Sequence, residues 1–445
     1  MTGTLPPPAV RPRGAAFGLG WSAATQVAGT VVRLASTLLL TRLLAPDAYA
    51  LLGTAMVVLT TLEWLSDLGV TAALVRHPKG GEAGWLLVGW RLNLHRGVGL
   101  AVAAAAAAAP LAEFYQQPDL TWVLVALAAR PLLLALRSPA APRLRRNLEY
   151  RALFVDELCQ VLVGAGTSIA LAWLVPGVGV WALVGGTLAG TVTGVVASYV
   201  LAPLAPRWHS DPVAGRELRR FGWGVLLNTL AMAGWLNLDR LLGLRLLPIE
   251  MVGCYVVATN LAAAVEAVLT RKLDVYFGLL NRRQADERGE WHTRTSQQVL
   301  NWAGPILCLG AFSAPFAVRL MYDARYHDAG LLLALLLTRL IFRLAGQLDF
   351  QLLLSDGRVL PATISYLIAG GAHAAAMFPL ASCFGATGVA ASVLLSTALL
   401  TIAQCLLAPT LRRGVLARLA TAGGWTTAGV VAGVVGENLS LGFAS

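Results

Sequence analysis

The sequence predicts an all-α, polytopic membrane protein with about twelve transmembrane helices, or thirteen if a C-terminal segment also crosses. Hydrophobic residues make up 57% of the 445 residues and charged residues only 13%, and the mean hydropathy is +0.67. Soluble domains carry about 25% charged residues, so this composition excludes a water-soluble protein. The distribution of arginine between loops and a repeat between the two halves of the chain then predict how the helices are arranged.

Apolar segments long enough to span a bilayer, which takes about 20 residues, follow one another along the chain. The first half contains six, at 17–41, 48–70, 84–112, 119–138, 153–175 and 178–203. The second half contains six more, at 219–241, 247–270, 298–321, 329–354, 359–381 and 385–409. A thirteenth candidate, 422–443, is rich in glycine and is interrupted by Glu437 and Asn438.

The net charge of +11 comes almost entirely from arginine, since Lys79 and Lys272 are the only lysines. With the spans placed as above, most arginines fall in one set of alternating loops, and the opposite set holds Arg42, Arg240, Arg245, Arg319 and Arg325. Cytoplasmic loops of membrane proteins collect basic residues. The asymmetry therefore supports twelve helices with a cytoplasmic N-terminus, and it explains the positive charge without a nucleic acid partner.

The two halves of the chain resemble each other. Phe17-Gly18 opens the first span and Phe221-Gly222 opens the seventh, and Glu63 in the second span corresponds to Glu266 in the eighth. Both halves begin on the same side, so the repeat is parallel, with its axis along the membrane normal. We therefore predict two six-helix lobes around a central cavity. The N-terminal lobe covers 1–205, the C-terminal lobe 206–410, and a tail with the extra candidate helix 411–445.

Three segments carry a family resemblance. The stretch 40–78 contains Arg-Leu-Leu-Ala-Pro at 42–46 and Asp-Leu-Gly at 67–69, followed by Ala73-Leu74-Val75. The basic segment 142–151 and the polar helix end 237–242 match in the same way. Together they resemble the oligosaccharide flippase (polysaccharide transporter, Wzx-type) family of the MOP (multidrug/oligosaccharidyl-lipid/polysaccharide) superfamily. The sequence departs from the family pattern at Ala50, where glycine is usual, and it stops short of fourteen helices.

The resemblance implies a flippase and not an enzyme. It implies a monomeric carrier in the bacterial cytoplasmic (inner) membrane that works by alternating access. The carrier would move an undecaprenyl-pyrophosphate-linked oligosaccharide from the cytoplasmic to the outer leaflet for surface polysaccharide synthesis, with polymerase or assembly proteins as further partners. Since the superfamily also contains peptidoglycan-precursor flippases and drug exporters, a cation-coupled drug exporter is an alternative. A non-transporting membrane subunit of a polysaccharide assembly complex is another.

Charged residues inside the predicted spans are the candidate substrate-binding residues, because a charge in the bilayer core costs about 2.5–3.5 kcal/mol. In the tenth span Arg339, Arg343 and Gln347 recur every four residues, continued by Gln351, and so lie on one helix face. A guanidinium matches the oxygens of a pyrophosphate bidentately. The alternative is an ion pair with Asp349 or Glu266.

The first span has a similar face with Gln26, Thr30, Arg33 and Thr37. Arg33 lies at a depth comparable to Arg339, so the two arginines could form a phosphate clamp between the lobes. The alternative for Arg33 is that its side chain reaches the outer membrane surface.

Three further arginines are candidates. Arg91 and Arg96 lie in the inner half of the third span, where their side chains could instead extend to the cytoplasmic headgroups. Arg130 precedes Pro131, so it faces the cavity or satisfies the carbonyl that this proline leaves without a donor.

Four acids within or at the ends of the spans are candidates for ion coupling: Glu63, Asp67, Asp239 and Glu266. A buried carboxylate could take up a coupling proton or Na⁺. The alternatives are a helix-end role for Asp67, before Gly69, and an ion pair with Arg240 for Asp239. His373 is expected to be a packing or hydrogen-bonding residue.

The sequence lacks the motifs of cofactor-dependent or hydrolytic enzymes. It contains no P-loop for ATP and no GxSxG or HExxH sequence. The five cysteines occur singly in apolar segments, so neither a zinc site nor a disulfide framework is expected. The longest polar loop, about 271–297, is predicted to be a solvated amphipathic linker without a catalytic domain, which disfavours a polymerase or glycosyltransferase. We expect no cleaved signal peptide in 1–14.

Overall fold

The computed structural model describes residues 12–66, 69–147, 149–281, 285–356, 358–407 and 415–442. Within these ranges the chain forms helices and short connections and contains no strand, which confirms the all-α prediction. Nine helices of the described part are long and apolar enough to cross a membrane. The chain is therefore a multi-pass membrane protein, and twelve crossings stays a prediction.

The helices follow in this order: α1 (Pro12–Leu43), α2 (Pro46–Leu65), α3 (Val70–Arg76), α4 (Ala83–Phe114), α5 (Leu120–Leu127), α6 (Ala129–Ala135), α7 (Ala141–Arg146), α8 (Tyr150–Leu174), α9 (Val180–Leu201), α10 (Pro212–Leu241), the 3₁₀ helix η1 (Gly243–Leu246), α11 (Ile249–Asn281), α12 (Ala285–Met321), the 3₁₀ helix η2 (Ala324–Tyr326), α13 (Ala329–Ser355), α14 (Val359–Leu407) and α15 (Val415–Gly442).

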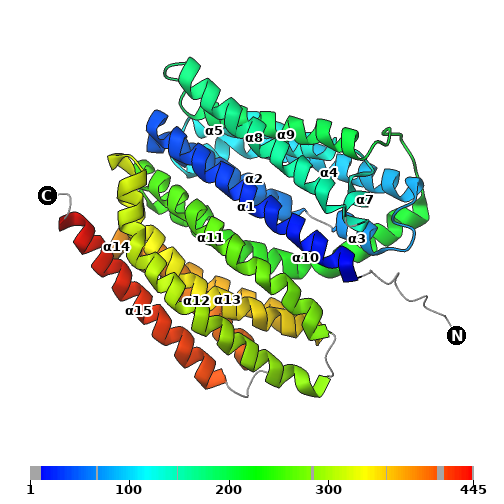
Figure 1. Ribbon diagram of the computed structural model, residues 1–445. Helices are drawn as coiled ribbons and strands as arrows, with labels where there is room; N and C mark the ends of the chain where they lie inside the picture. The colour runs from blue at the N-terminus through cyan, green and yellow to red at the C-terminus, as the bar shows by residue number, and fades with distance from the viewer. Residues whose placement is uncertain are drawn as a thin grey trace.

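The long helices lie roughly alongside one another, with the first half of the chain on one side and the second half on the other (Figure 1). In the first half α8 packs against both α9 and α1, and in the second half α12 packs against α13 and α15. The halves meet mainly where α2 packs against α11 and α10. The lobe boundaries that the repeat predicts remain a prediction.

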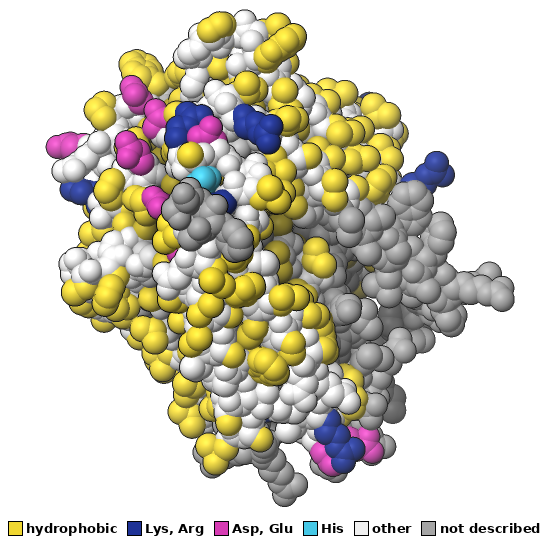
Figure 2. Space-filling view, turned by 60° about the vertical axis from the view of Figure 1, so that its left-hand side comes forward, with side chains coloured by type: hydrophobic (Ala, Val, Ile, Leu, Met, Phe, Trp, Pro, Cys, Tyr) yellow, Lys and Arg dark blue, Asp and Glu magenta, His cyan; other side chains and the backbone are white. Residues whose placement is uncertain are grey.

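Connections alternate between two ends of this bundle. We call the end at which α1, α4 and α8 begin the proximal end, and the end at which they finish the distal end. The arginine-rich segment around α7 lies at the proximal end, as does the connection between α9 and α10, which contains Arg207. On the face drawn in Figure 2, hydrophobic side chains cover most of the described surface, and most charged side chains gather in two separate places. Such an apolar flank suits contact with lipid chains.

The fourth predicted span, 119–138, is an apolar helix over Leu120–Ala135 with an interruption in its hydrogen-bond pattern. It is divided into α5 and α6, with Ala128 between them. Pro131 is the cause, because a proline has no N–H for the i→i−4 bond and its ring crowds the carbonyl four residues earlier. The break matters because it directly precedes Arg130.

Two other predicted boundaries are wrong. The predicted span 48–70 ends at Leu65, and α3 begins only after Gly69, whose φ of 60° is left-handed. The predicted linker 271–297 is largely helical, because α11 continues to Asn281 and α12 begins at Ala285. The polar residues of this region therefore extend two membrane helices beyond the apolar segments.

Two glycines reverse the chain at corresponding places in the two halves. Gly179 before α9 has φ 54° and ψ −131°, and Gly385 within α14 has φ 57° and ψ −132°. This backbone conformation is essentially restricted to glycine. Gly385 divides α14 into two helices, which correspond to the eleventh and twelfth predicted spans, 359–381 and 385–409. The matching geometry is consistent with the predicted repeat.

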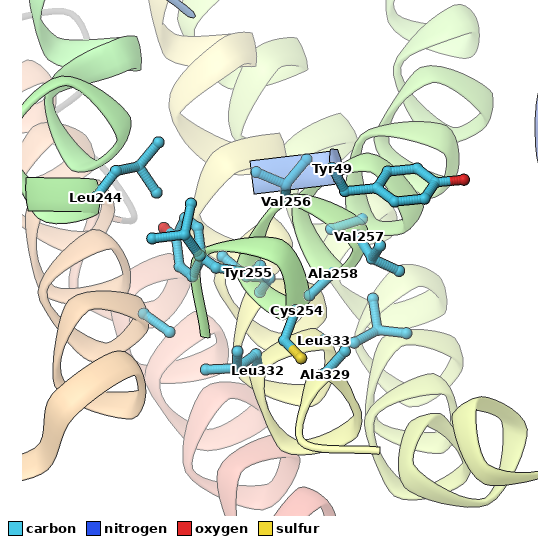
Figure 3. Packing of buried hydrophobic residues seen from close by; sticks show 14 of the residues in the cluster. Tyr49, Leu244, Cys254, Tyr255, Val256, Val257, Ala258, Ala329, Leu332 and Leu333 are labelled. Atoms are coloured by element: carbon cyan, nitrogen blue, oxygen red, sulfur yellow. The ribbon is translucent and has the colours of Figure 1, made fainter. Parts of the chain in front are cut away.

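A large apolar core joins the two halves near the distal end. On α11, Val256 and Val257 lie beside Tyr49 of α2, while Cys254 lies near Leu333 of α13 (Figure 3). A side chain on Gly53 of α2 would collide with Val256, so the two helices approach closely there. The packing of α11 between α2 and α13 places its middle turns beside the cavity described next.

Candidate functional site

A cavity of about 830 Å³ lies between the two halves. Its wall is built from α1, α2, α8 and α9 of the first half, from α11 of the second half, and from single residues of α6 and α10. Three arginines belong to the lining, Arg33, Arg130 and Arg240, and none of the described lining residues is acidic. The cavity therefore offers positive charge to a ligand.

Arg33 lies on the face of α1 that the sequence predicts to be polar. Its Nη2 donates to Oε1 of Glu157 on α8 at 3.1 Å. Both side chains are substantially exposed, at 55% and 40%. Since Arg33 also lines the cavity, an anionic ligand there could reach its guanidinium and compete with Glu157.

Arg130 follows the break between α5 and α6. Its Nη1 donates to Oε1 of Glu63 on α2 at 2.5 Å, and both side chains are largely buried. This pair fixes the guanidinium at the cavity wall. Of the two roles that the sequence left open, this geometry favours the one at the cavity, because the side chain points to Glu63 and belongs to the cavity lining.

Arg240 is the cavity residue that the sequence analysis missed. We counted its charge with the distal loops although it falls at the end of the predicted span 219–241, and the structure places it in α10, where it lines the cavity. No hydrogen bond or ion pair to a described residue engages its guanidinium, although Glu266 lies within electrostatic reach. The available signal was its place in the segment 237–242, which resembles a flippase helix end.

Arg339 and Arg343 do not belong to this lining. On α13 they bind the two carboxylate oxygens of Glu266 on α11, at 3.3 and 3.0 Å. The side chains of all three are largely buried. In the structure both arginines are thus ion-paired with Glu266, which is the alternative named above. Arg33 lines the cavity and Arg339 does not, so the two do not form the predicted clamp. A substrate-binding role for Arg339 and Arg343 remains untested.

The other polar residues of this region are buried in the C-terminal half. Asp239 accepts a 2.6 Å hydrogen bond from the hydroxyl of Tyr255 and is not paired with Arg240. Gln347 and Gln351 each have a buried amide oxygen that makes no hydrogen bond. Both ring nitrogens of His373 are also buried and make no hydrogen bond. Of the two roles expected for His373, packing or hydrogen bonding, the contacts with described residues fit packing.

Two predicted residues lie outside what the structure describes. Gln26 is in α1, but its side chain is not among the described ones, and Asp67 is outside the described ranges altogether. Asp349, the other partner considered for Arg339, instead contacts His292, Cys405 and Arg418 in a buried cluster. This cluster fastens α15 to α12, α13 and α14.

A second cavity, of about 470 Å³, lies between α2, α4, the α6–α7 connection and α8. Arg96 is in its lining and donates to Oγ of Ser66 at 2.9 Å and to the carbonyl of Glu63 at 2.5 Å. Arg91 lies elsewhere, with its guanidinium 5.8 Å from the ring of Trp208 in the α9–α10 connection. The two arginines of the third predicted span therefore have different surroundings.

Tyrosine hydroxyls join the two halves at the distal end. Tyr115, after α4, donates to the carbonyl of Leu241 in the second half at 2.7 Å. Tyr326, before α13, donates to the carbonyl of Leu44 in the first half at 3.1 Å. Each half thus supplies one donor and one acceptor, and these reciprocal bonds close the bundle on the distal side of the cavity.

The described residues contain no group of histidine, cysteine, aspartate or glutamate that could hold a metal ion. The chemistry of the central cavity is that of binding by guanidinium groups, with hydroxyls and apolar side chains around them. This fold and cavity are typical of a membrane carrier with its site between two helical halves.

Solved structures identify the class of this fold. An inward-facing multidrug resistance MATE family transporter of the MOP superfamily has a TM-score of 0.64 at 14% identity, covering 90% of this chain and 99% of that one. An inward closed structure of the lipid II flippase MurJ has a TM-score of 0.63 at 9% identity, covering 96% and 98%. A MOP superfamily transporter from Pyrococcus furiosus has a TM-score of 0.55 at 14% identity, covering 91% and 96%. The fold is therefore that of the MOP superfamily transporters.

Sequence comparison gives the family. The profile of the family described as "Polysaccharide biosynthesis protein" matches residues 39–330, and the chain belongs to this family. The succinoglycan biosynthesis transport protein ExoT of Rhizobium meliloti (strain 1021) is 24% identical over 297 residues, which cover 66% of this chain and 59% of that protein. The relatives and structural neighbours named here are transporters, a flippase or biosynthesis proteins, and none is described as an enzyme.

Proposed function

We propose that this chain is a flippase for undecaprenyl-pyrophosphate-linked oligosaccharides in a bacterial cytoplasmic membrane. The proximal end faces the cytoplasm, and the substrate moves to the outer leaflet for surface polysaccharide synthesis. The family match and the functions of ExoT, a succinoglycan biosynthesis transport protein, and MurJ, a lipid II flippase, support this choice of substrate class. The basic connections at the proximal end support the orientation.

The observation that carries the proposal is the arginine lining of the central cavity. Arg240 has no hydrogen-bonded partner among the described residues, and Arg33 has only an exposed one. An arginine fork binds phosphate oxygens in pairs. A pyrophosphate can therefore occupy the cavity by engaging Arg240, while Arg130 of the same lining stays fixed by Glu63.

The same lining disfavours a cation-coupled drug exporter. A cationic drug needs carboxylates or several aromatic faces, whereas no described residue of the central cavity lining is acidic and Tyr49 is its single described aromatic residue. Coupling of lipid transfer to H⁺ or Na⁺ remains part of the proposal, with Glu63, Asp239 and Glu266 as the candidate acids. Each of the three already accepts a hydrogen bond from arginine or tyrosine.

Transfer of a fluorescent undecaprenyl-pyrophosphate-linked sugar between the leaflets of proteoliposomes tests the proposal. Charged hydrogen bonds contribute about 1.5–3 kcal/mol, so Arg240→Gln should lower the initial transfer rate at sub-saturating lipid by about 10- to 100-fold. Arg245→Gln is the matched control, since Arg245 lies in η1 just beyond α10 and does not line the cavity. Wild-type protein that transfers nothing under pH or Na⁺ gradients would leave a drug exporter or a non-transporting subunit in its place.

A further inference from the structure

The second cavity adjoins the central one on its proximal side. Glu63 lines the second cavity and is bonded to Arg130 of the central cavity. Asp156 also lines the second cavity, and it accepts a 3.0 Å hydrogen bond from Gln160 of the central cavity. Two side-chain pairs thus form a shared wall. A ligand that reaches the central arginines from the proximal end has the second cavity beside its path.

The chemistry of the second cavity differs from that of the central one. Its lining includes three arginines and two carboxylates, so the charges largely balance. Two of the arginines are held by protein acceptors: Arg137 by Asp156, and Arg96 by Ser66 and the backbone of Glu63. The cavity therefore offers fixed donors and acceptors in similar numbers and no strong attraction for an anion.

Two indoles and an amide complete the lining. Trp64 and Trp90 supply large flat apolar surfaces. The Nε1 atom of Trp90 is buried and has no hydrogen-bond acceptor, and no hydrogen bond to a described residue engages the amide of Asn93. A buried donor without an acceptor costs about 1–3 kcal/mol, and such groups at a cavity wall suit a ligand that supplies the missing partner.

We infer that the second cavity is a binding site for the sugar portion of a lipid-linked substrate. Sugars combine apolar C–H faces, which pack on indole rings, with hydroxyls that both donate and accept hydrogen bonds. A volume of about 470 Å³ lies in the ~300–1,000 Å³ range of small-ligand sites. The pyrophosphate at the central arginines and the sugar beside Trp90 would then occupy adjoining cavities, as their covalent link requires. The inference rests on the proposed function.

The test compares two lipids that differ only in the sugar. We would measure by native mass spectrometry, in nanodiscs, the dissociation constants of undecaprenyl pyrophosphate and of undecaprenyl pyrophosphate that carries one galactose. Wild-type protein should bind the galactosylated lipid more tightly. Trp90→Phe keeps the ring and deletes the N–H, and it should reduce this preference about 5-fold, as expected for one hydrogen bond. Asn93→Ala should reduce it similarly.

Trp122→Phe is the matched control, because Trp122 is 67% exposed on α5 and does not line the cavity. Affinity for undecaprenyl pyrophosphate itself should be the same in all these variants, which shows that they are folded. Equal wild-type affinity for the two lipids, or an unchanged preference in both cavity variants, would overturn the inference and leave the proposed function standing. Failure of the wild type to bind either lipid would overturn both.

Discussion

Arginines at comparable depth in this protein have different roles because their partners differ. Arg339 and Arg343 share the carboxylate of Glu266, so their charges are neutralised inside the second half. Arg240 lies nearby and has no such partner among the described residues. A charge that is buried and paired stabilises the fold only as long as its partner remains. A charge at a cavity wall is available to a ligand.

Glu266→Gln should therefore destabilise the protein strongly. Removal of one partner from a buried ion pair costs about 3–5 kcal/mol, and here one substitution affects two arginines. Thermal unfolding in detergent, followed by the loss of monomer on size exclusion, would measure the effect. Glu290→Gln is the control, because its pair with Arg294 is more than 70% exposed. Similar unfolding temperatures for the two variants would contradict a structural role of Glu266.

At the scale of elements, single residues fix how helices begin and turn. Gly385 allows α14 to change direction with a positive φ, and Pro131 divides α5 from α6. Arg146 of α7 donates to the carbonyls of Leu74, Val75, His77 and Pro78, so it holds the end of α3 and the loop after it. The basic segment 142–151 that carried the family resemblance thus has a structural role at the proximal end.

Gly385→Ala should lower the free energy of unfolding by about 1–3 kcal/mol, because a residue with a Cβ is strained at this φ and ψ. Gly371→Ala in the same helix is the control. A Cβ there meets no atom within 4 Å, and alanine favours the helix over glycine by about 1 kcal/mol. Thermal unfolding should rank the proteins Gly371→Ala, wild type, Gly385→Ala from the most to the least stable. A Gly385→Ala variant as stable as the wild type would refute the strained turn.

Arg146→Gln should loosen the segment 74–78 without unfolding the rest. Its guanidinium makes four hydrogen bonds to backbone carbonyls, and glutamine cannot reach them all. Amide hydrogen exchange, resolved by peptide, should be faster in this segment and unchanged in α12 and α13. Arg151→Gln, which removes an exposed arginine of the same basic segment, should change neither.

For the whole molecule, the reciprocal hydrogen bonds of Tyr115 and Tyr326 connect the halves where the central cavity ends. Tyr326 also packs edge-on against Tyr49 at 6.0 Å, so the contact is both polar and apolar. Since a carrier must open to each side in turn, these bonds have to break when the distal side opens. They favour the state described here, with the distal end closed.

The double variant Tyr115→Phe/Tyr326→Phe should open more often on the distal side. Two lost hydrogen bonds of about 1 kcal/mol each predict roughly 10- to 30-fold more opening. In a cysteine-free background with Ala264→Cys in the cavity wall, an impermeant maleimide added on the distal side should react correspondingly faster. Tyr199→Phe is the control, because it loses a hydroxyl bond to Leu136 within one half. Equal labelling of the double variant and this control would exclude a closing role for the two tyrosines.

The sequence by itself determined the membrane class, the approximate positions of the apolar helices and the polar face of α1. Composition and apolar length are properties of the chain alone, and side-chain period places Arg33 on a polar face of α1 whatever surrounds it. Only the tertiary structure decided which helix lies opposite each face. It paired Glu266 with arginines more than 70 positions away, placed Arg240 at the cavity wall, and brought Trp64 of α2 and Trp90 of α4 to the lining of a second cavity. Such partners depend on the packing between distant segments, and periodicity within one helix carries no information about that packing.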